Sequence, residues 1–321
     1  MNGSLPRRAL RKLRLASIRQ PDLDRMYPPE KFPVVYVNTI DCADMVLRLA
    51  GSGRRIIHHV HELSYTTELF NAVVALKQAV SHTFAYIAVS HSVREYLEKS
   101  IGVPTEKIHV IHGFPLVSAD ENHKTETGRT IRRQLCIADD VCIIGMCGLP
   151  QWRKGTDLFV QLALQMKRNV GSTQCHFVWL GGNVGDHREA LYDIAKTGLQ
   201  DICHFIPAVS NPQAYFSAFD LFALTSREDP FSLAMLEAAE SGLPIVCFAD
   251  AGGAPDFVEN DAGTVVPYLD VPAMAKACAE LLMNESRCKQ IGKNARAKVQ
   301  EHYTLEKQGP KLLAVIEGAM H

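Results

Sequence analysis

The sequence predicts an α/β protein made of two parallel-sheet domains, and three observations lead to that prediction. Short apolar runs alternate with segments of helical period along most of the chain, which is the order that builds parallel sheets with helical crossovers. The length of 321 residues is enough for two domains, each with its own core. Polar residues or glycines follow many of the apolar runs, at the sheet edge where open α/β folds bind ligands.

The first domain is expected to span residues 1–128, including a linker at its end. Apolar runs predict buried parallel strands, and segments of helical period predict the helices between them. The expected strands are 34–38, 55–61, 86–90 and 108–111, and the expected helices are 41–50, 67–82 and 92–100. Residues 119–129 are polar and lack an apolar period, so we expect them to form the linker.

The second domain is expected to span residues 129–321. Its predicted strands are 141–147, 175–180, 204–206, 221–224 and 245–248. Its predicted helices are 130–135, 157–167, 188–197, 212–218, 230–241, 271–283, 285–302 and 305–320. The two halves share a βα architecture, although no internal sequence repeat is visible.

Residues 221–255 form the βαβ unit around which the chain is organised. Asp229 is placed as the N-cap of a helix with Pro230 at its first position, and Gly242 is placed to end it. Glu237 lies among apolar neighbours on this helix. A buried carboxylate costs several kcal/mol unless a partner satisfies it, so Glu237 needs a structural arginine or a ligand hydroxyl. For Asp229, a plain capping role and a ligand role are both open.

Composition excludes several classes of function. The formal net charge of −1 provides no broad field that would attract nucleic acid. The nine cysteines are scattered and form no CxxC motif, which is typical of reduced thiols in a cytosolic protein and not of disulfides or metal ligands. We find no signal peptide and no apolar stretch of the roughly 18 residues that span a bilayer, so a cytoplasmic location is expected.

Residues 1–20 carry six basic side chains and no acidic one, together with several leucines. These basic residues are Arg7, Arg8, Arg11, Lys12, Arg14 and Arg19. One interpretation is a solvated tail or short amphipathic helix. The other is peripheral contact with an anionic membrane surface, because each basic residue near such a surface adds about 1 kcal/mol of attraction.

The run Asp229-Pro230-Phe231-Ser232-Leu233 to Glu237, with Gly242, Pro244 and the later Gly252-Gly253 pair, resembles a known signature. It is similar to the donor-binding segment of retaining family 4 glycosyltransferases, which have the GT-B fold of two Rossmann-like domains. The resemblance implies that an acidic residue, Asp229 or the preceding Glu228, contacts the donor sugar. It also implies that Glu237 contacts the ribose, and that Phe231, Ser232 and Leu233 lie beside the nucleotide sugar.

Further residues match the same family. Arg153 and Lys154 follow Gly148 in a glycine-bounded loop, where two cations can neutralise a leaving diphosphate; the alternative is two solvated surface cations. The resemblance places Gly182 and Val209 near the nucleotide base and ribose, although the segment around Val209 equally fits an ordinary turn. His61 resembles the histidine that faces the sugar from the first domain, although a lone histidine is more often structural.

Two departures from the family pattern stand out. The family has an arginine directly after the first glycine, where this chain has Leu149, so Arg153 is the candidate to replace it. The strand and glycine-rich turn that normally open the first domain are not found before residue 34. We therefore expect a short first domain, which favours the alternative that the chain is a non-catalytic remnant.

The sequence thus predicts a metal-independent glycosyltransferase that moves a sugar from a nucleotide-diphosphate sugar to a saccharide or lipid-linked acceptor with retention of configuration. No bound cofactor is expected, and the alternation along the strand sends His58 and His59 to opposite faces, which argues against a metal site. Two alternatives stay open. One is a non-catalytic remnant that binds a nucleotide sugar, and the other is a sugar-nucleotide epimerase of similar architecture.

Overall fold

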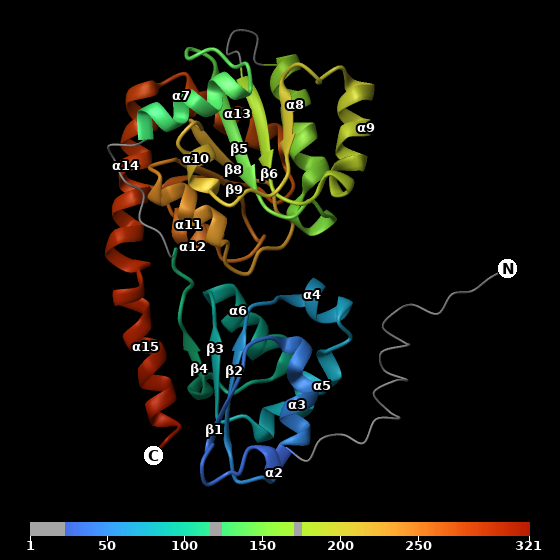
Figure 1. The fold of residues 1–321 in the computed structure, drawn as a ribbon, viewed down its shortest axis with the longest axis vertical. Coiled ribbons are helices and arrows are strands. Elements are labelled where there is room, and N and C mark those ends of the chain that lie inside the picture. Colours follow the sequence, from blue (N-terminus) through green and yellow to red (C-terminus); the bar gives the residue numbers. More distant parts are fainter. Residues whose placement is uncertain (1–22, 116–123, 170–174) are drawn as a thin grey trace, which may run out of the picture.

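A computed structural model of the chain describes residues 23–115, 124–169 and 175–321. Two parallel sheets, each flanked by helices, form two domains that are stacked along the long axis of the molecule (Figure 1). This is the predicted α/β class with two Rossmann-like domains. The basic segment 1–20 and residues 119–123 of the expected linker lie outside the described residues.

The first domain holds a four-stranded sheet in the order β1-β2-β3-β4, with every pair parallel. The strands are β1 (Val34–Val37), β2 (Arg55–Val60), β3 (Ala85–Ala88) and β4 (Ile108–Val110). All four residues of β3 are buried, as expected for a central strand. The prediction of a buried strand at 34–38 was wrong in one respect: β1 lies at the sheet edge, and its Tyr36 is exposed.

Helices of the first domain cover the faces of this sheet. They are α2 (Leu23–Met26), η1 (Ile40–Cys42), α3 (Ala43–Arg48), α4 (Ser64–Leu69), α5 (Val73–Ala79), η2 (Val80–His82), α6 (His91–Tyr96), η3 (Leu97–Ile101) and η4 (Thr105–Lys107). The single helix expected at 67–82 was wrong, because Asn71 takes a positive φ of 51° that interrupts the helix between α4 and α5. Ser90 caps α6 by accepting a hydrogen bond from the Val93 N–H at 3.2 Å.

The second domain holds a six-stranded parallel sheet in the order β10-β9-β8-β5-β6-β7. The strands are β5 (Cys142–Cys147), β6 (Cys175–Leu180), β7 (Cys203–Ile206), β8 (Leu221–Leu224), β9 (Ile245–Phe248) and β10 (Gly263–Val266). Strands β8 and β9 are buried throughout, in line with their continuous apolar runs. Strand β10 was not expected, because its four residues begin with a glycine and form too short an apolar run to be recognised.

The α-helices of the second domain match the sequence predictions except at three places, and the two short 3-10 helices were not expected. The helices of both kinds are α7 (Lys124–Gln134), η5 (Trp152–Lys154), α8 (Thr156–Asn169), η6 (Val184–His187), α9 (Arg188–Thr197), α10 (Pro212–Phe216), α11 (Leu233–Glu240), α12 (Ala254–Val258), α13 (Val271–Leu282), α14 (Glu285–His302) and α15 (Leu305–Gly318). Helix α12 was not expected, and α11 begins later than predicted.

The third difference concerns the linker, since residues 124–129 belong to α7 and not to an irregular segment. Helix α7 packs on α10 of the second domain. At Gly128 a Cβ atom would lie 2.5 Å from the carbonyl oxygen of Ser217, so only glycine allows this close approach. Tertiary packing thus makes a helix of a polar segment whose sequence has little apolar period.

The last two helices connect the domains. Helix α14 packs on α11 of the second domain, and α15 continues along the first domain, as the red helices of Figure 1 show. Val315 and Ala319 join a buried apolar cluster with Ile57 and Ile87 of the first sheet. At the junction, the buried Gln308 side chain accepts a hydrogen bond from the His112 N–H at 3.2 Å.

Candidate active site between the two domains

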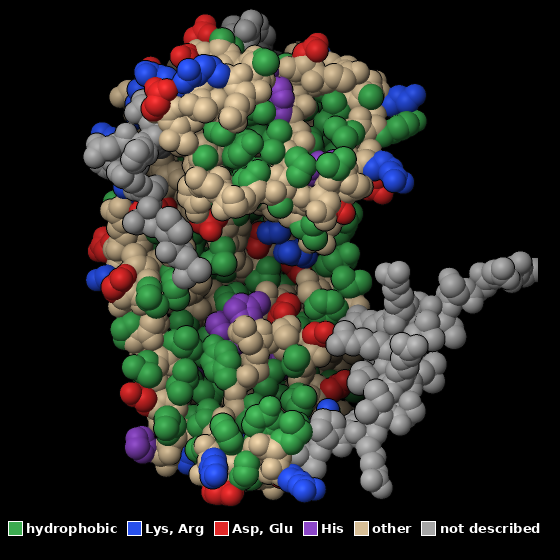
Figure 2. Space-filling view, in the orientation of Figure 1, with side chains coloured by type: hydrophobic (Ala, Val, Ile, Leu, Met, Phe, Trp, Pro, Cys, Tyr) green, Lys and Arg blue, Asp and Glu red, His purple; other side chains and the backbone are tan. Residues whose placement is uncertain are grey.

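A cavity of about 530 Å³ lies between the domains, at the carboxyl ends of strands from both sheets. His59, His61 and Glu62 line it from the end of β2, and Arg153 and Asp229 line it from the second domain. Figure 2 shows this hollow at mid-height, with purple histidines on its lower wall and blue basic side chains on its upper wall. Ligands of open α/β sheets bind at this end of the strands, so the cavity is the candidate active site.

Asp229 is the acidic group that faces this cavity from the second domain. Its carboxylate accepts a hydrogen bond from the Lys154 ammonium at 2.6 Å and another from the Ser226 hydroxyl at 3.3 Å. The Lys154 and Asp229 side chains are 13% and 6% exposed, so this ion pair is largely removed from water. Two charges that satisfy each other here avoid the penalty of burying either one alone.

The assignment of Asp229 as a helix N-cap was wrong. Helix α11 begins at Leu233, and the Ser232 hydroxyl caps it by accepting a hydrogen bond from the Met235 N–H at 3.3 Å. Asp229 instead forms a β-bridge with Gly252, and its N–H donates to the Ala251 carbonyl at 2.6 Å. A Cβ atom on Gly252 would lie 1.9 Å from the Asp229 carbonyl oxygen, so this bridge requires glycine.

Arg153 and Lys154 occupy a short 3-10 turn that leads from β5 to α8. The Arg153 guanidinium donates to the Glu228 carbonyl oxygen at 2.7 Å, whereas Lys154 reaches Asp229. Gly155 ends the turn with a φ of 68°, and a Cβ atom there would lie 1.9 Å from the carbonyl oxygen of Thr225. The glycine therefore allows the turn to pack on the segment after β8, which brings both cations beside the two acidic residues.

Glu228 points away from the cavity and toward the first domain. Its carboxylate accepts hydrogen bonds from the N–H groups of Tyr65 at 2.9 Å and Thr66 at 3.3 Å. The hydroxyls of Ser64 and Thr66 donate to it at 3.3 and 3.4 Å. The first turn of α4 has unpaired N–H groups and a partial positive charge, which a carboxylate stabilises. Of the two acids, Asp229 lines the cavity, and Glu228 bridges the domains.

Glu237 is a half-buried carboxylate on α11 for which no hydrogen bond or ion pair is found within the described part of the chain. Burial raises the pKa of this carboxyl. Cys147, at the end of β5, has a pKa raised to about 12. Burial is the main cause, the Glu237 charge adds to it, and the Lys154 charge opposes it. Glu237 therefore lies near the carboxyl end of β5. It is the fifth residue of α11, one turn from the start of the helix, because α11 begins at Leu233 and not at the predicted Pro230.

The three residues before and at the start of α11 differ in their surroundings. The ring of Phe231 is buried and packs on His112, 4.7 Å between centroids, and on Tyr303 at 5.6 Å. Its side chain therefore belongs to the packing between the domains. The hydroxyl of Ser232 is used by the helix cap, whereas Leu233 is 50% exposed and lines the cavity.

Gly148, Gly182 and Val209 follow β5, β6 and β7, so they lie along the same edge of the second sheet. A Cβ atom on Gly182 would lie 2.4 Å from the Cδ atom of Pro150, which shows how closely these loops approach one another. The Ala208 N–H donates to the Gly182 carbonyl at 2.8 Å. Val209 is 37% exposed at this edge.

The histidines after β2 form a cluster on the first-domain wall. The exposed His61 ring lies 2.9 Å from the side-chain oxygen of Asn38 through Nε2, and 4.0 Å between centroids from His59. Partial burial of the ring in the cleft lowers the pKa of His61, and the negative charge of Glu62 opposes this shift. His59 contacts the Tyr36 hydroxyl at 2.5 Å, and burial together with the neighbouring histidines lowers its pKa to about 3. No group of three metal-ligating side chains is found in the described residues.

His112 and Glu62 are among the cavity residues that the sequence analysis did not assign to the site. His112 follows β4 and lines the cavity, with its Nδ1 2.9 Å from the Val89 carbonyl oxygen. Glu62 accepts hydrogen bonds from the Thr39 hydroxyl at 2.6 Å and the His61 N–H at 2.9 Å. The position after a strand, which drew attention to His61, also applies to His112, so the sequence did carry a signal for it.

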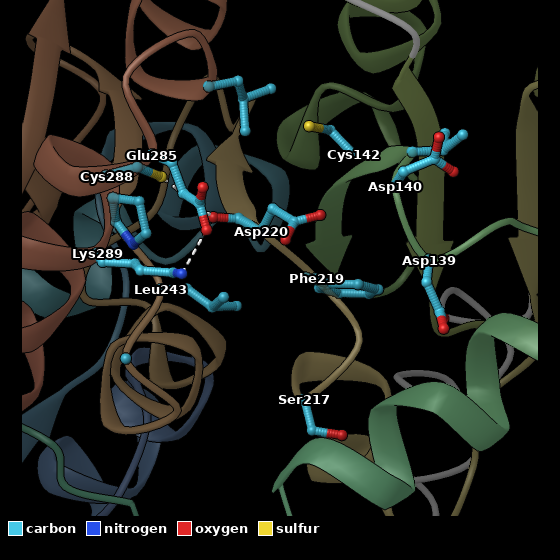
Figure 3. A pocket seen from close by; sticks show the side chains of 14 residues that line it. Asp139, Asp140, Cys142, Ser217, Phe219, Asp220, Leu243, Glu285, Cys288 and Lys289 are labelled. Carbon is cyan, nitrogen blue, oxygen red and sulfur yellow. Dashed lines mark hydrogen bonds and ion pairs between the residues drawn. The ribbon is translucent and has the colours of Figure 1, made fainter.

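A larger cavity of about 670 Å³ lies at the opposite edge of the second sheet. Cys142, Asp220 and Pro244 line it from the amino ends of β5, β8 and β9, and Figure 3 shows the side chains around it. Its basic group, Lys289, forms an ion pair with Glu285. Parallel sheets bind their ligands at the carboxyl ends of the strands, so this cavity is not the candidate active site.

Comparison with known families confirms the family resemblance seen in the sequence. The family model "Glycosyl transferases group 1" matches residues 128–298, more than half of the chain, and "Glycosyltransferase Family 4" matches residues 3–114. The chain belongs to this glycosyltransferase family. The matched segment of the second domain includes the Lys154 loop, Asp229 and Glu237.

Relatives of this glycosyltransferase include the lipopolysaccharide core biosynthesis mannosyltransferase LpsB of Rhizobium meliloti. The two are 28% identical over 188 residues, which is 55% of this chain and 52% of LpsB. A GDP-mannose-dependent alpha-(1-6)-phosphatidylinositol monomannoside mannosyltransferase of Mycobacterium tuberculosis is 26% identical over 284 residues, covering 84% of this chain and 71% of the relative. The chain thus spans about half the length of the first relative and seven-tenths of the second.

Solved structures agree with the GT-B fold of the chain. HepE from Anabaena, in complex with UDP and glucose, superposes with a TM-score of 0.78 at 20% identity, over 92% of this chain and 83% of HepE. Sucrose-phosphate synthase of Thermosynechococcus elongatus gives the same score at 19% identity, over 95% and 80%. Within the described residues, no helix is both long enough and apolar enough to span a bilayer.

Proposed function

We propose that this chain is a glycosyltransferase that transfers a hexose from a nucleotide-diphosphate sugar to an acceptor in glycoconjugate or polysaccharide synthesis, with retention of configuration. The observation that carries the proposal is the cluster of Lys154, Asp229 and Glu237 at the carboxyl ends of strands β5 and β8. Family membership and the names of two relatives, both mannosyltransferases, support the same class of reaction.

The diphosphate of the donor would lie on the turn that holds Arg153 and Lys154, near the start of α11. Helix α11 presents unpaired N–H groups and a partial positive charge there. The Lys154 ammonium is neutralised by the Asp229 carboxylate. A diphosphate competes for the Lys154 ammonium, and this releases the Asp229 carboxylate to accept hydrogen bonds from the sugar hydroxyls. Donor binding and the exposure of Asp229 are therefore coupled.

Glu237 takes the ribose hydroxyls in this arrangement, because it is a half-buried carboxylate with no partner found within the described residues. Gly148, Gly182 and Val209 lie along the same sheet edge and leave room for the nucleotide, while His61 faces the sugar from the first domain. The acceptor would attack from the face that the leaving phosphate occupies, with that phosphate accepting the acceptor's proton. This reaction requires no nucleophile from the protein and no metal ion.

The acceptor is a saccharide or a lipid-linked acceptor, and the site of synthesis is the cytoplasm.

We also propose, from the sequence alone, that residues 1–20 bind the anionic inner face of a membrane. Deleting these residues is then expected to abolish co-sedimentation with phosphatidylglycerol vesicles at low salt. Vesicles that fail to sediment the full chain would show that the segment does not bind lipid.

The test of the proposed function is release of nucleoside diphosphate from UDP-, GDP- and ADP-sugars by the purified chain, with and without saccharide acceptors. Turnover of one donor that is lost in Asp229→Asn supports the transferase. Binding of a donor without turnover under any condition favours the alternative of a non-catalytic nucleotide-sugar-binding protein. An altered sugar recovered still attached to its nucleotide, without an acceptor, would instead identify an epimerase.

A further inference from the structure

A second interdomain cleft of about 550 Å³ lies beside the candidate active site, and aromatic side chains line it. Trp152, Tyr65 and Tyr268 reach it and are 54%, 37% and 45% exposed. Large aromatic side chains normally bury most of their surface when the protein folds. Three exposed rings that converge on one concave surface therefore indicate a ligand site.

The three rings are held in place by their neighbours. Trp152 lies 4.8 Å from Tyr65 between ring centroids, and the Arg227 guanidinium carbon lies 4.9 Å from the Trp152 centroid. Arg227 is in turn fixed by two hydrogen bonds of 2.7 Å to Asp157, and its carbonyl accepts from the Tyr268 hydroxyl at 3.2 Å. A binding surface held in this way loses little freedom when a ligand binds.

The charged groups of the cleft are largely neutralised by partners within the protein. Lys99 forms an ion pair with Glu95, and Arg227 forms one with Asp157. The Glu228 carboxylate accepts hydrogen bonds from the start of α4. The cleft's two cations are thus both engaged, which disfavours a phosphate or a nucleotide as its ligand and favours a molecule without net charge.

Groups that can bond hydroxyls surround the rings. The Asp250 carboxylate is exposed at the edge of the cleft, and the hydroxyls of Ser92 and Ser100 line the opposite wall, on the first domain. A pyranose ring presents apolar C–H groups on one face, which pack on an aromatic ring, and hydroxyls around its rim, which need donors and acceptors. The lining of the cleft provides both kinds of contact.

We propose that this aromatic cleft binds a neutral oligosaccharide, namely the part of the acceptor that lies away from its reacting end. The inference rests on the proposed function. Tyr65 lines both cavities, and the consecutive residues Glu228 and Asp229 line one cavity each. The aromatic cleft therefore adjoins the candidate active site at Tyr65.

Tryptophan fluorescence provides a direct test, because the chain has two tryptophans and Trp179 is fully buried. Acrylamide is expected to quench Trp152, and a bound saccharide is expected to protect it. The probes are mannohexaose and maltohexaose, each titrated without any nucleotide sugar. Tyr268→Ala is expected to weaken binding about two- to tenfold, the loss of one aromatic contact. Tyr192→Ala is the matched control, since Tyr192 is 62% exposed on α9 and outside the cleft.

Unchanged quenching of Trp152 by both hexasaccharides up to about 10 mM, well above a millimolar Kd, would overturn the inference. Protection that is equal in the wild type and in Tyr268→Ala would also overturn it. The assay contains no donor, so its failure is distinguishable from failure of the proposed function. A chain that turns over a nucleotide sugar but leaves Trp152 unprotected retains the function and lacks this subsite.

Discussion

The ammonium of Lys154 lies 2.6 Å from the carboxylate of Asp229, in a contact that joins the loop after β5 to the segment after β8. Both side chains are largely removed from water. Each charge therefore depends on the other, although both residues were assigned to ligand binding from the sequence. A substitution in this pair is therefore expected to change both the free energy of unfolding and the affinity for the donor.

Lys154→Met is expected to destabilise the protein by about 3–5 kcal/mol, because it leaves the Asp229 carboxylate buried without its cation. A solvated surface lysine, the alternative that the sequence left open, would have no such effect, and the ion pair with Asp229 excludes it. Chemical denaturation of the variant measures the loss. The double variant Lys154→Met/Asp229→Asn is expected to recover much of it, and a double variant as unstable as the single one would contradict the pairing.

Glu237→Gln is expected to leave the unliganded protein as stable as the wild type, or slightly more stable, at pH 7. Burial raises the pKa of Glu237 above its unfolded value, so its contribution favours folding at low pH and is lost as the pH rises through the folded pKa. The ionised carboxylate therefore opposes folding at neutral pH, and glutamine removes that penalty. The melting temperatures of both proteins at pH 4 and pH 7 check this. A variant that melts several degrees lower at pH 7 would identify Glu237 as part of a structural ion pair.

Glu228→Gln is expected to loosen the contact between the domains, because it removes the charge that the first turn of α4 stabilises. A charge–helix contact of this kind contributes about 0.3–2 kcal/mol, enough to shift the population toward more open arrangements. Small-angle scattering is expected to show a larger radius of gyration for the variant. Glu95→Gln is the control. Glu95 lines the aromatic cleft, as Glu228 does, but it pairs with Lys99 in its own domain.

Acid is expected to destabilise the protein below about pH 6.5, the unfolded pKa of histidine. Burial lowers the pKa of His58 to about 4, although its contact with the Thr39 carbonyl opposes the shift. The neutral ring is thus favoured in the folded state. The contribution of His58 to the free energy of unfolding is therefore fully present above pH 6.5 and is lost as the pH drops toward 4. The loss from this residue is on the order of 3 kcal/mol. His58→Gln is expected to flatten the denaturation profile between these pH values, and an unchanged profile would contradict the assignment.

The sequence was most informative where the chain repeats simple patterns. Continuous apolar runs identified β8 and β9, because strands buried on both faces leave no room for polar residues. Local signals failed where a tertiary contact decided the backbone. The bridge between Asp229 and Gly252 moved the start of α11 to Leu233, and neither residue reports that contact locally. Helix α7 likewise owes its start to packing on α10.

The candidate site was predictable in its residue types and less so in its contacts. Spacing and position after strands brought Lys154, Asp229 and Glu237 to one edge of a sheet. The sequence could not show whether Glu228 or Asp229 faces the cavity, because the two residues are adjacent in a loop. That choice depends on the first domain, where the start of α4 takes the Glu228 carboxylate. The position of His112 was accessible by the rule that identified His61.

Titration of the purified chain with UDP-, GDP- and ADP-sugars by isothermal calorimetry tests the central claim most directly. We expect one donor to bind, and its affinity to fall about tenfold or more in Glu237→Gln and in the Lys154→Met/Asp229→Asn double variant, because each loses charge-assisted hydrogen bonds. The aromatic-cleft variant Tyr268→Ala is expected to bind the donor normally. Absence of binding by all three classes of donor, or a donor affinity that both substitutions leave unchanged, would contradict the assignment of the Lys154, Asp229 and Glu237 cluster as the nucleotide-sugar site.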